Sequence, residues 1–312
     1  MVFLTALRAV AVLLLIALPG YILMKRKMLS EACIPGLSKI LLFLTQPCLA
    51  VYTFKSAEYS LEKLIDVGKF ALLSAIILGA MIGGAYILLR RRYGQSIYRV
   101  MTFAVGSANC AFFGIPIIEA LIPNMAADVI IYTMVFSFVM NLIGWTAGSA
   151  IMAQDIRYIS VKQIFINPAM IGTAIALVLF VTELPIPSDL MSMVTTTGKM
   201  ATPISMIVMG MRLATMDLKK MFTNIRVYVA VFAKLVIMPL AALLLVVFLP
   251  ISPDVKATFF IICACPIASV ALNYAEIVGE GQDEAASMLL MATMLSIVTL
   301  PFMALFLPLL GI

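Results

Sequence analysis

Histidine is absent from the 312 residues of this chain, and charged residues make up only 12% of it. Without histidine, the chain has neither a Ser-His-Asp triad nor a Cys-His nucleophile pair. The cysteines all lie inside apolar runs: Cys33, Cys48, Cys110, Cys263 and Cys265. A disulfide framework or a zinc site is therefore not expected. We expect a protein that is not an enzyme and that holds no metal and no cofactor.

Apolar residues account for 64% of the chain, and its mean hydropathy is +1.14. A bilayer core requires about 20 apolar residues per helix, and runs of that length recur along the whole sequence. We expect ten spans, near residues 5–24, 31–53, 67–90, 98–121, 127–152, 167–184, 190–213, 227–249, 255–278 and 285–307. The expected fold class is an all-α membrane protein in contact with lipid, with no soluble domain.

Basic residues gather in the loops on one side of these spans. Those loops contain Lys25, Arg26, Lys27, Arg90, Arg91, Arg92, Arg99, Arg157, Lys162, Arg212, Lys219, Lys220 and Arg226. The other side contains only Lys55, Lys63, Lys69 and Lys256. By the positive-inside rule, the richer side is cytoplasmic, so both termini are expected outside the cytoplasm. The net charge of +6 thus indicates orientation in the plasma or inner membrane, and no nucleic-acid partner is expected.

Ten spans divide into two sets of five, residues 1–155 and 156–312. Because five is odd, a second set built like the first crosses the membrane in the opposite sense. The fourth span of each set carries a proline at mid-depth, Pro116 in span 4 and Pro266 in span 9. Paired interruptions at corresponding positions are typical of the binding sites of inverted-repeat transporters.

Span 4 contains the segment NCAFFGIP, residues 109–116. A proline inside a helix costs about 3 kcal/mol and a glycine about 1 kcal/mol, and the freed backbone groups find no water in lipid. A simple proline kink is the alternative, and for a lone proline it is the better interpretation. Here Asn109 and Gly114 accompany Pro116, and span 9 has its own interruption at CACPIASVALN, residues 263–273. We therefore expect two true breaks that are buried in protein or line an aqueous cavity.

The prolines predict where the second half-helices begin. If each is the first residue of a new half-helix, both N-terminal ends lie near the membrane centre. Each end carries about half a positive charge, so two ends that face one cavity favour an anion, most simply a carboxylate.

Several segments resemble the auxin efflux carrier family, which includes bacterial organic-anion carriers and the plant PIN proteins. NCAFFGIP is similar to the family motif Asn-Thr-Gly-Phe-Leu-Gly-Ile-Pro. The segments INPAMIGTAIALVLF, ATPISMIVMGMRL, ACPIASVALNYAEIVG and LSIVTLPF are similar to the family's spans 6, 7, 9 and 10. The sequence departs from the motif at Cys110 and Ala111, where threonine and glycine are usual, which leaves the identity of the substrate open.

This resemblance implies ten helices in two inverted five-helix repeats with crossing broken helices 4 and 9, an arrangement like that of sodium–proton antiporters and bile-acid transporters. It also implies elevator-like alternating access, in which spans 3–5 and 8–10 move against a scaffold of spans 1, 2, 6 and 7. The scaffold of the family often forms a homodimer.

The candidate substrate-binding residues are Asn109, Cys110, Gly114, Pro116, Gln46, Asn141, Pro266, Asn273 and Lys199. Asn109 either contacts the substrate, as the resemblance implies, or caps the carbonyl groups of the first half-helix. Interhelical hydrogen bonding or packing explains Asn273, Asn141 and Gln46 equally well. Four cations lie within spans: Arg8, Lys39, Lys199 and Lys234. Each needs a partner or an aqueous cavity, and Lys199 is the preferred functional candidate.

Two acidic residues inside spans, Glu119 and Glu276, are candidates for a coupling ion. Burial favours the protonated form of a carboxyl group, so either could take up H⁺. Na⁺ coupling and uniport stay open, and so do the direction of transport and the anion carried.

We conclude from the sequence that the chain is a secondary transporter of small organic anions. A channel or an anion-sensing receptor on the same scaffold is the alternative. An intramembrane aspartyl protease is disfavoured, because it needs two membrane aspartates and no aspartate lies clearly within a span.

Overall fold

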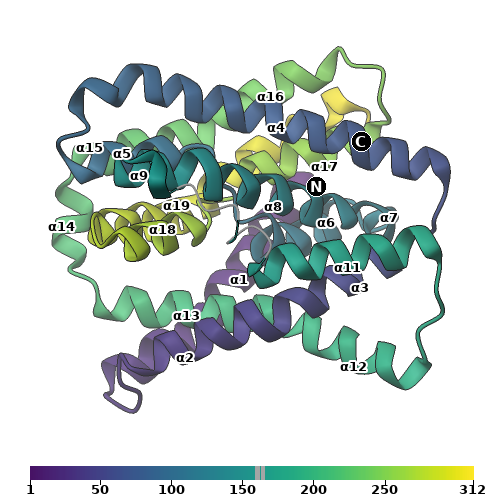
Figure 1. The fold of residues 1–312 in the computed structure, drawn as a ribbon, viewed down its shortest axis with the longest axis horizontal. Helices are drawn as coiled ribbons and strands as arrows, with labels where there is room; N and C mark the ends of the chain where they lie inside the picture. Colours follow the sequence, from purple (N-terminus) through teal and green to yellow (C-terminus); the bar gives the residue numbers. More distant parts are fainter. Residues whose placement is uncertain (159–161, 163–165) are drawn as a thin grey trace.

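The computed structural model describes residues 1–158, 162 and 166–312, and within them the chain forms helices and no strand (Figure 1). Residues 159–161 and 163–165, in the loop expected after span 5, lie outside the described residues.

The helices of the first half are α1 (Val2–Lys25), α2 (Cys33–Ile40), α3 (Gln46–Ser56), α4 (Leu61–Leu89), α5 (Ser96–Ala104), α6 (Ile115–Leu121), α7 (Ala126–Val129), α8 (Ile131–Ile143) and α9 (Ser149–Ala153). Those of the second half are α11 (Pro168–Thr182), α12 (Ser188–Lys199), α13 (Ala201–Thr215), α14 (Leu218–Thr223), α15 (Ile225–Phe232), α16 (Met238–Val247), α17 (Pro253–Ala264), α18 (Val270–Val278) and α19 (Gln282–Ala304). Short 3₁₀ turns are η2 (Arg90–Arg92), η5 (Ile156–Tyr158) and η7 (Leu307–Leu310).

Six helical runs in the described part are long and apolar enough to cross a membrane: Val2–Lys25, Cys33–Ser56, Leu61–Arg92, Ala126–Ala153, Ile225–Val247 and Gln282–Ala304. The chain is therefore a multi-pass membrane protein. Shorter helices occupy the remaining stretches in which the sequence predicts a span.

Wide π-type turns occur inside several helical runs, namely η1 (Leu41–Thr45), η3 (Cys110–Gly114), η4 (Gly144–Gly148) and η6 (Ala233–Ile237). Three of them directly precede a helix whose second residue is proline: Pro47, Pro116 and Pro239. A proline ring clashes with the carbonyl group four residues earlier, and a wider turn relieves that clash. The amide of Gly114 illustrates this, since it donates to the carbonyl oxygen of Asn109, five residues back, at 3.1 Å.

Glycines allow α1 and α13 to pack backbone against backbone. A Cβ atom added at Gly20 would lie 2.1 Å from the carbonyl oxygen of Ile207, and one added at Gly210 would lie 1.9 Å from that of Ala17. Small residues permit this close approach of membrane helices, and no larger residue fits at either position without separating them.

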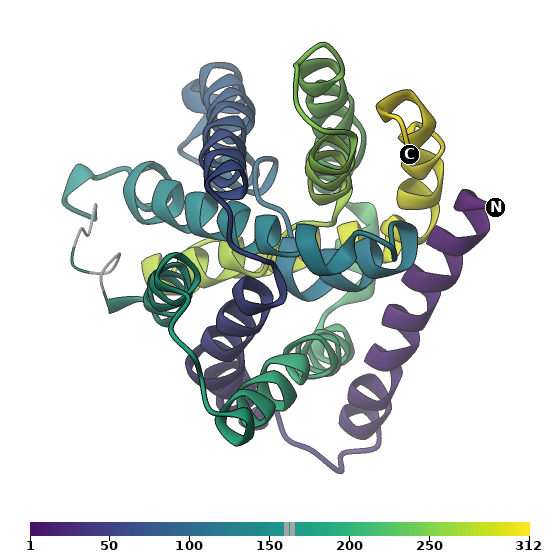
Figure 2. The same cartoon turned by 90° about the vertical axis from the view of Figure 1, so that its right-hand side faces the viewer.

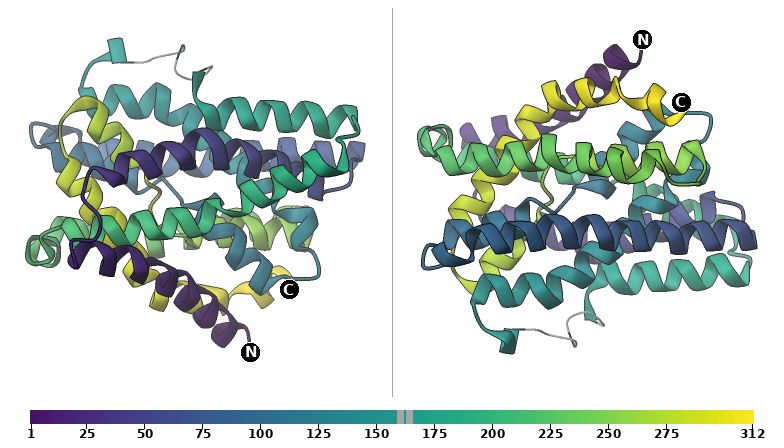
Figure 3. Two further views of the ribbon diagram at one scale, coloured as in Figure 1. Left: turned by 90° about the horizontal axis from the view of Figure 1, so that it is seen from below. Right: turned by 90° about the horizontal axis from the view of Figure 1, so that it is seen from above.

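The helices form a layered arrangement around the two interrupted runs, 96–121 and 253–278 (Figure 2). Helices α4 and α15–α16 run side by side on one face (Figure 3, right). The opposite face is formed by α2–α3 and α11–α13, where α11 packs against α3 through Gly172 and Pro47. The interrupted runs thus lie in the interior, between these two faces.

Candidate functional site

Two helical interruptions meet in the interior of the protein. Helix α5 ends at Ala104 and helical structure resumes at Cys110, while α17 ends at Ala264 and α18 begins at Val270. The backbone amide of Asn109 donates a hydrogen bond of 2.8 Å to the carbonyl oxygen of Pro266. Both interruptions that the sequence predicts are therefore present, and they contact one another directly.

The prediction that each proline is the first residue of its half-helix is wrong. Pro116 is the second residue of α6, and the π-type turn η3 extends the second half-helix back to Cys110. Pro266 lies in the non-helical segment before Val270. The positively polarised N-terminal ends consequently lie near residues 110 and 270, and the prolines mark the neighbourhood of each break only.

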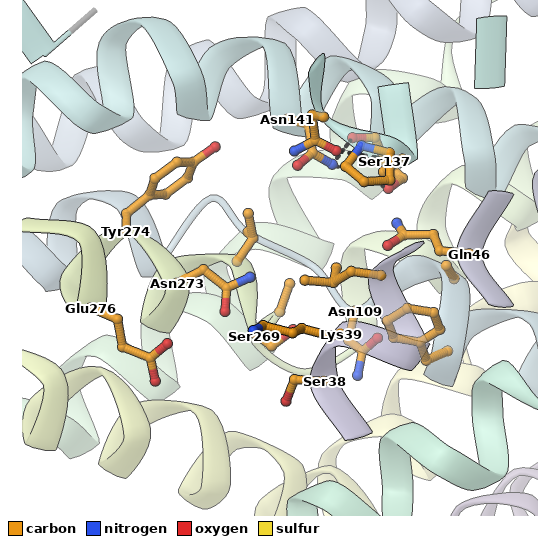
Figure 4. Close-up of a pocket in the computed structure, with 18 of the residues that line it drawn as sticks. Ser38, Lys39, Gln46, Asn109, Ser137, Asn141, Ser269, Asn273, Tyr274 and Glu276 are labelled. Carbon is orange, nitrogen blue, oxygen red and sulfur yellow. Dashed lines mark hydrogen bonds between the residues drawn. The ribbon is translucent and has the colours of Figure 1, made fainter. Parts of the chain in front are cut away.

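A cavity of about 780 Å³ adjoins both breaks. It is lined by predicted substrate residues from four helical runs: Gln46, Asn109, Cys110, Asn141 and Asn273. The predicted coupling residue Glu276 also lines it. Figure 4 shows these amide side chains arranged around one open space.

The amide side chains around the cavity differ in how far the protein itself satisfies them. The Asn141 amide group donates to the carbonyl oxygen of Ser137 at 2.8 Å. Asn109 is 6% exposed, and its side chain makes no capping hydrogen bond to the turn that follows it. The Oε1 atom of Gln46 is buried and has no hydrogen-bond partner among the described residues. Asn109 and Gln46 therefore have unused hydrogen-bonding capacity at the cavity.

The charged residues that line the cavity are Glu31, Lys39, Arg212 and Glu276. Arg212 on α13 and Glu276 on α18, which both line the cavity, form an ion pair of 3.1 Å. Lys39, from the last turn of α2, belongs to none of the ion pairs found between described residues. Figure 4 shows Lys39 among the residues drawn around the open space.

The remaining predicted residues do not line this cavity: Gly114, Pro116, Pro266, Lys199 and Glu119. Gly114 packs at the contact of the two breaks, since a Cβ atom there would lie 3.4 Å from Cys265 Sγ. The Lys199 ammonium group lies 5.2 Å from the ring centroid of Tyr52.

The predicted substrate residues omit several polar residues of the cavity: Ser38, Ser137, Ser269, Tyr274 and Lys39, of which Lys39 was expected only to need a partner or an aqueous cavity. A signal for Lys39 was present, because it precedes Gln46 by seven residues. Two helical turns place both residues on one face of the run, so the assignment of Gln46 to the cavity could have brought Lys39 with it.

Among the described residues, no group of three or more histidine, cysteine, aspartate or glutamate side chains is placed to hold a metal ion. The cavity residues provide amide and hydroxyl groups together with two cationic and two carboxylate side chains, which are suited to hydrogen-bonding a small polar or charged molecule.

Comparison with known proteins agrees with a transport role. No curated protein matches the chain. Residues 5–304 match the family model described as membrane transport protein, which represents the auxin efflux carriers. Because the match covers nearly the whole chain, this protein belongs to the auxin efflux carrier family of membrane transport proteins.

Proposed function

We propose that this membrane transporter carries small organic anions, bound through a carboxylate, as a secondary active transporter. One observation supports this most strongly: residues at the N-terminal ends of both second half-helices, Cys110 and Val270, line the same cavity. Helix N-terminal ends attract anions through their partial positive charge and their free amide groups.

Side chains at the cavity fit the same ligand. Lys39 adds a full positive charge, and the amide group of Asn109 offers hydrogen-bond donors that the protein does not use. A carboxylate accepts charge-assisted hydrogen bonds from such groups, which are stronger than neutral ones. Trp145 and Tyr274 add aromatic surface, with ring centroids 5.0 Å apart, for an apolar part of the substrate.

The proposal includes the architecture that the family resemblance implies. Ten helices form two inverted repeats, residues 1–155 and 156–312, and spans 3–5 and 8–10 move as an elevator against the remaining spans of a homodimer. The cavity residues Asn167 and Arg212 adjoin the basic loops, which the positive-inside rule assigns to the cytoplasm. The cavity accordingly opens inward, and both termini lie outside, in the inner or plasma membrane.

Proton coupling through Glu119 or Glu276 belongs to this proposal. Glu276 lines the cavity, whereas Glu119 lies in the second half-helix of span 4, away from it. Replacement of either residue by glutamine, followed by transport with and without a pH gradient, would identify the coupling residue.

The test is transport by purified protein in liposomes. A thermal-shift screen of acetate, lactate, malonate, malate, glutamate and indole acetate first identifies the carboxylate that binds. Uptake of that carboxylate should saturate and should accelerate when the same compound is loaded inside the liposomes. Unsaturable uptake without acceleration would indicate a channel, and binding without uptake a receptor.

A further inference from the structure

A fully buried lysine lies next to the interruption of span 9. Lys234 is in the π-type turn between α15 and α16 and is 0% exposed. Its ammonium group donates to the carbonyl oxygen of Cys263 at 2.9 Å and contacts the sulfur of Met238 at 3.0 Å. The cavity residues described above do not include Lys234.

The carbonyl group bound by Lys234 belongs to the last turn of α17, which ends at Ala264. Carbonyl groups at a helix C-terminal end carry partial negative charge and lack intrahelical partners, and the membrane interior offers no water to satisfy them. Lys234 therefore caps this end with a cation. At the corresponding end of α5, the neutral hydroxyl of Ser107 donates to the carbonyl oxygen of Ala104 at 3.0 Å.

Lys234 has no anionic partner in the described part of the chain. The buried charged side chains there are Arg99 and Lys234, and no described aspartate or glutamate is buried. Arg99 pairs with Glu280, whereas the printed partners of the Lys234 ammonium group, the Cys263 carbonyl oxygen and the Met238 sulfur, are both uncharged. A buried charge is normally paired, so a cation without a protein partner indicates a ligand that brings the opposite charge.

The missing charge has a place close to Lys234. Lys234 binds the carbonyl oxygen of Cys263, three residues before Pro266, and the carbonyl oxygen of Pro266 accepts from the amide of Asn109, which lines the cavity. The Lys234 ammonium group and a carboxylate bound at Asn109 would attract one another more strongly than they would in water, because little water screens charges in the protein interior.

We propose that Lys234 is a fixed internal cation that takes the place of a co-transported metal ion. This inference rests on the proposed function, because it assumes that the cavity binds an anion. The ammonium group neutralises the carbonyl end of α17 and balances the charge of the bound carboxylate. Neither Na⁺ nor K⁺ is then needed for folding of the break or for anion binding.

The first test uses metal ions alone as the probe. The melting temperature of the purified wild-type protein is measured in sodium, potassium and choline chloride at constant ionic strength. Equal melting temperatures in the three salts support the proposal. A rise that saturates with Na⁺ or K⁺ concentration overturns it, because such a rise shows a dedicated metal-ion site.

The second test compares Lys234→Met, Lys234→Arg and Ser107→Ala, using the carboxylate from the panel above with the largest thermal shift. Lys234→Met should weaken its binding by about tenfold or more, and Lys234→Arg should restore most of the affinity. Ser107→Ala removes a neutral cap of the other break and should leave the affinity unchanged. Wild-type affinity in Lys234→Met, or failure of Lys234→Arg to restore binding, overturns the proposal.

The two tests separate this inference from the proposed function. If Lys234→Met cannot be purified, the salt comparison on the wild-type protein still decides whether a metal ion is used, and Lys234→Arg still tests the need for positive charge. Absence of binding by every carboxylate of the panel contradicts the proposed function, whereas metal-dependent stability contradicts only the role assigned to Lys234.

Discussion

Replacement of Asn109 by alanine separates ligand binding from stability. The side chain of Asn109 makes no capping hydrogen bond, and the hydrogen bonds of this residue to Pro266, Phe113 and Gly114 use its backbone amide and carbonyl group. Alanine retains the backbone, so we expect Asn109→Ala to fold, insert and melt like the wild-type protein.

The expected loss of affinity follows from the hydrogen bonds that the amide would make to a carboxylate. A hydrogen bond to a charged group contributes about 1.5–3 kcal/mol. Loss of one such bond raises the Kd by about 10- to 150-fold at 25 °C. Isothermal titration calorimetry of the purified variant with the carboxylate identified by thermal shift measures this change.

Asn224 provides a matched control with the opposite expectation. Its side-chain oxygen accepts from the amide of Arg226 at 3.1 Å and caps α15, away from the cavity. Asn224→Ala should therefore lower stability by about 1 kcal/mol and leave the Kd unchanged. An unchanged Kd in Asn109→Ala, or a loss of stability like that of Asn224→Ala, would refute the assignment of Asn109 to the ligand.

Three further predictions concern packing and charge. Gly210→Ala should lower the melting temperature, because the added methyl group would lie 1.9 Å from the Ala17 carbonyl oxygen. The control Gly79→Ala, whose added methyl group meets no atom within 4 Å, should stabilise the protein by up to about 1 kcal/mol. Scanning fluorimetry compares the melting temperatures of the two variants. Lys39→Met should weaken carboxylate binding and reduce its dependence on salt, measured by titration at several ionic strengths. Glu276→Gln should lower stability by no more than about 1 kcal/mol, since the ion pair of Glu276 with Arg212 is partly exposed. The variant should bind the carboxylate more tightly, because the substitution removes a negative charge from the cavity. Thermal melting measures the first effect and titration measures the second.

The positions of the helices were predictable because hydrocarbon imposes a simple rule on composition. The expected second span, 31–53, overlaps the run Cys33–Ser56, and the expected fifth, 127–152, overlaps Ala126–Ala153. The starts of the half-helices were not predictable. A proline indicates that the regular helix is disturbed nearby. Whether the disturbance is a break or a wide turn depends on the packing around it, as at residues 110–116.

The amide residues of the cavity were predictable, whereas the cations were not. Asn109 lies in the unwound backbone of span 4 and Asn273 lies in the first turn of α18, so their positions next to the breaks limit where their side chains go. Lys199 was the preferred candidate from the sequence, yet of the two lysines only Lys39 lines the cavity, while Lys199 lies over the ring of Tyr52. The two lysines differ in the direction in which each side chain leaves its helix. Whether that direction meets the cavity depends on helices far away in the sequence, and composition does not predict it.

The interlocked glycines of α1 and α13 limit how this molecule is able to deform. Displacing α1 by one helical turn along its axis would bring Ile16 or Met24 to about the place of Gly20, against the Ile207 backbone. We therefore expect α1 and α13 to move together as one rigid unit, without sliding along one another. Whatever rearrangement exposes the binding pocket alternately to the two sides of the bilayer has to take place along other helix boundaries.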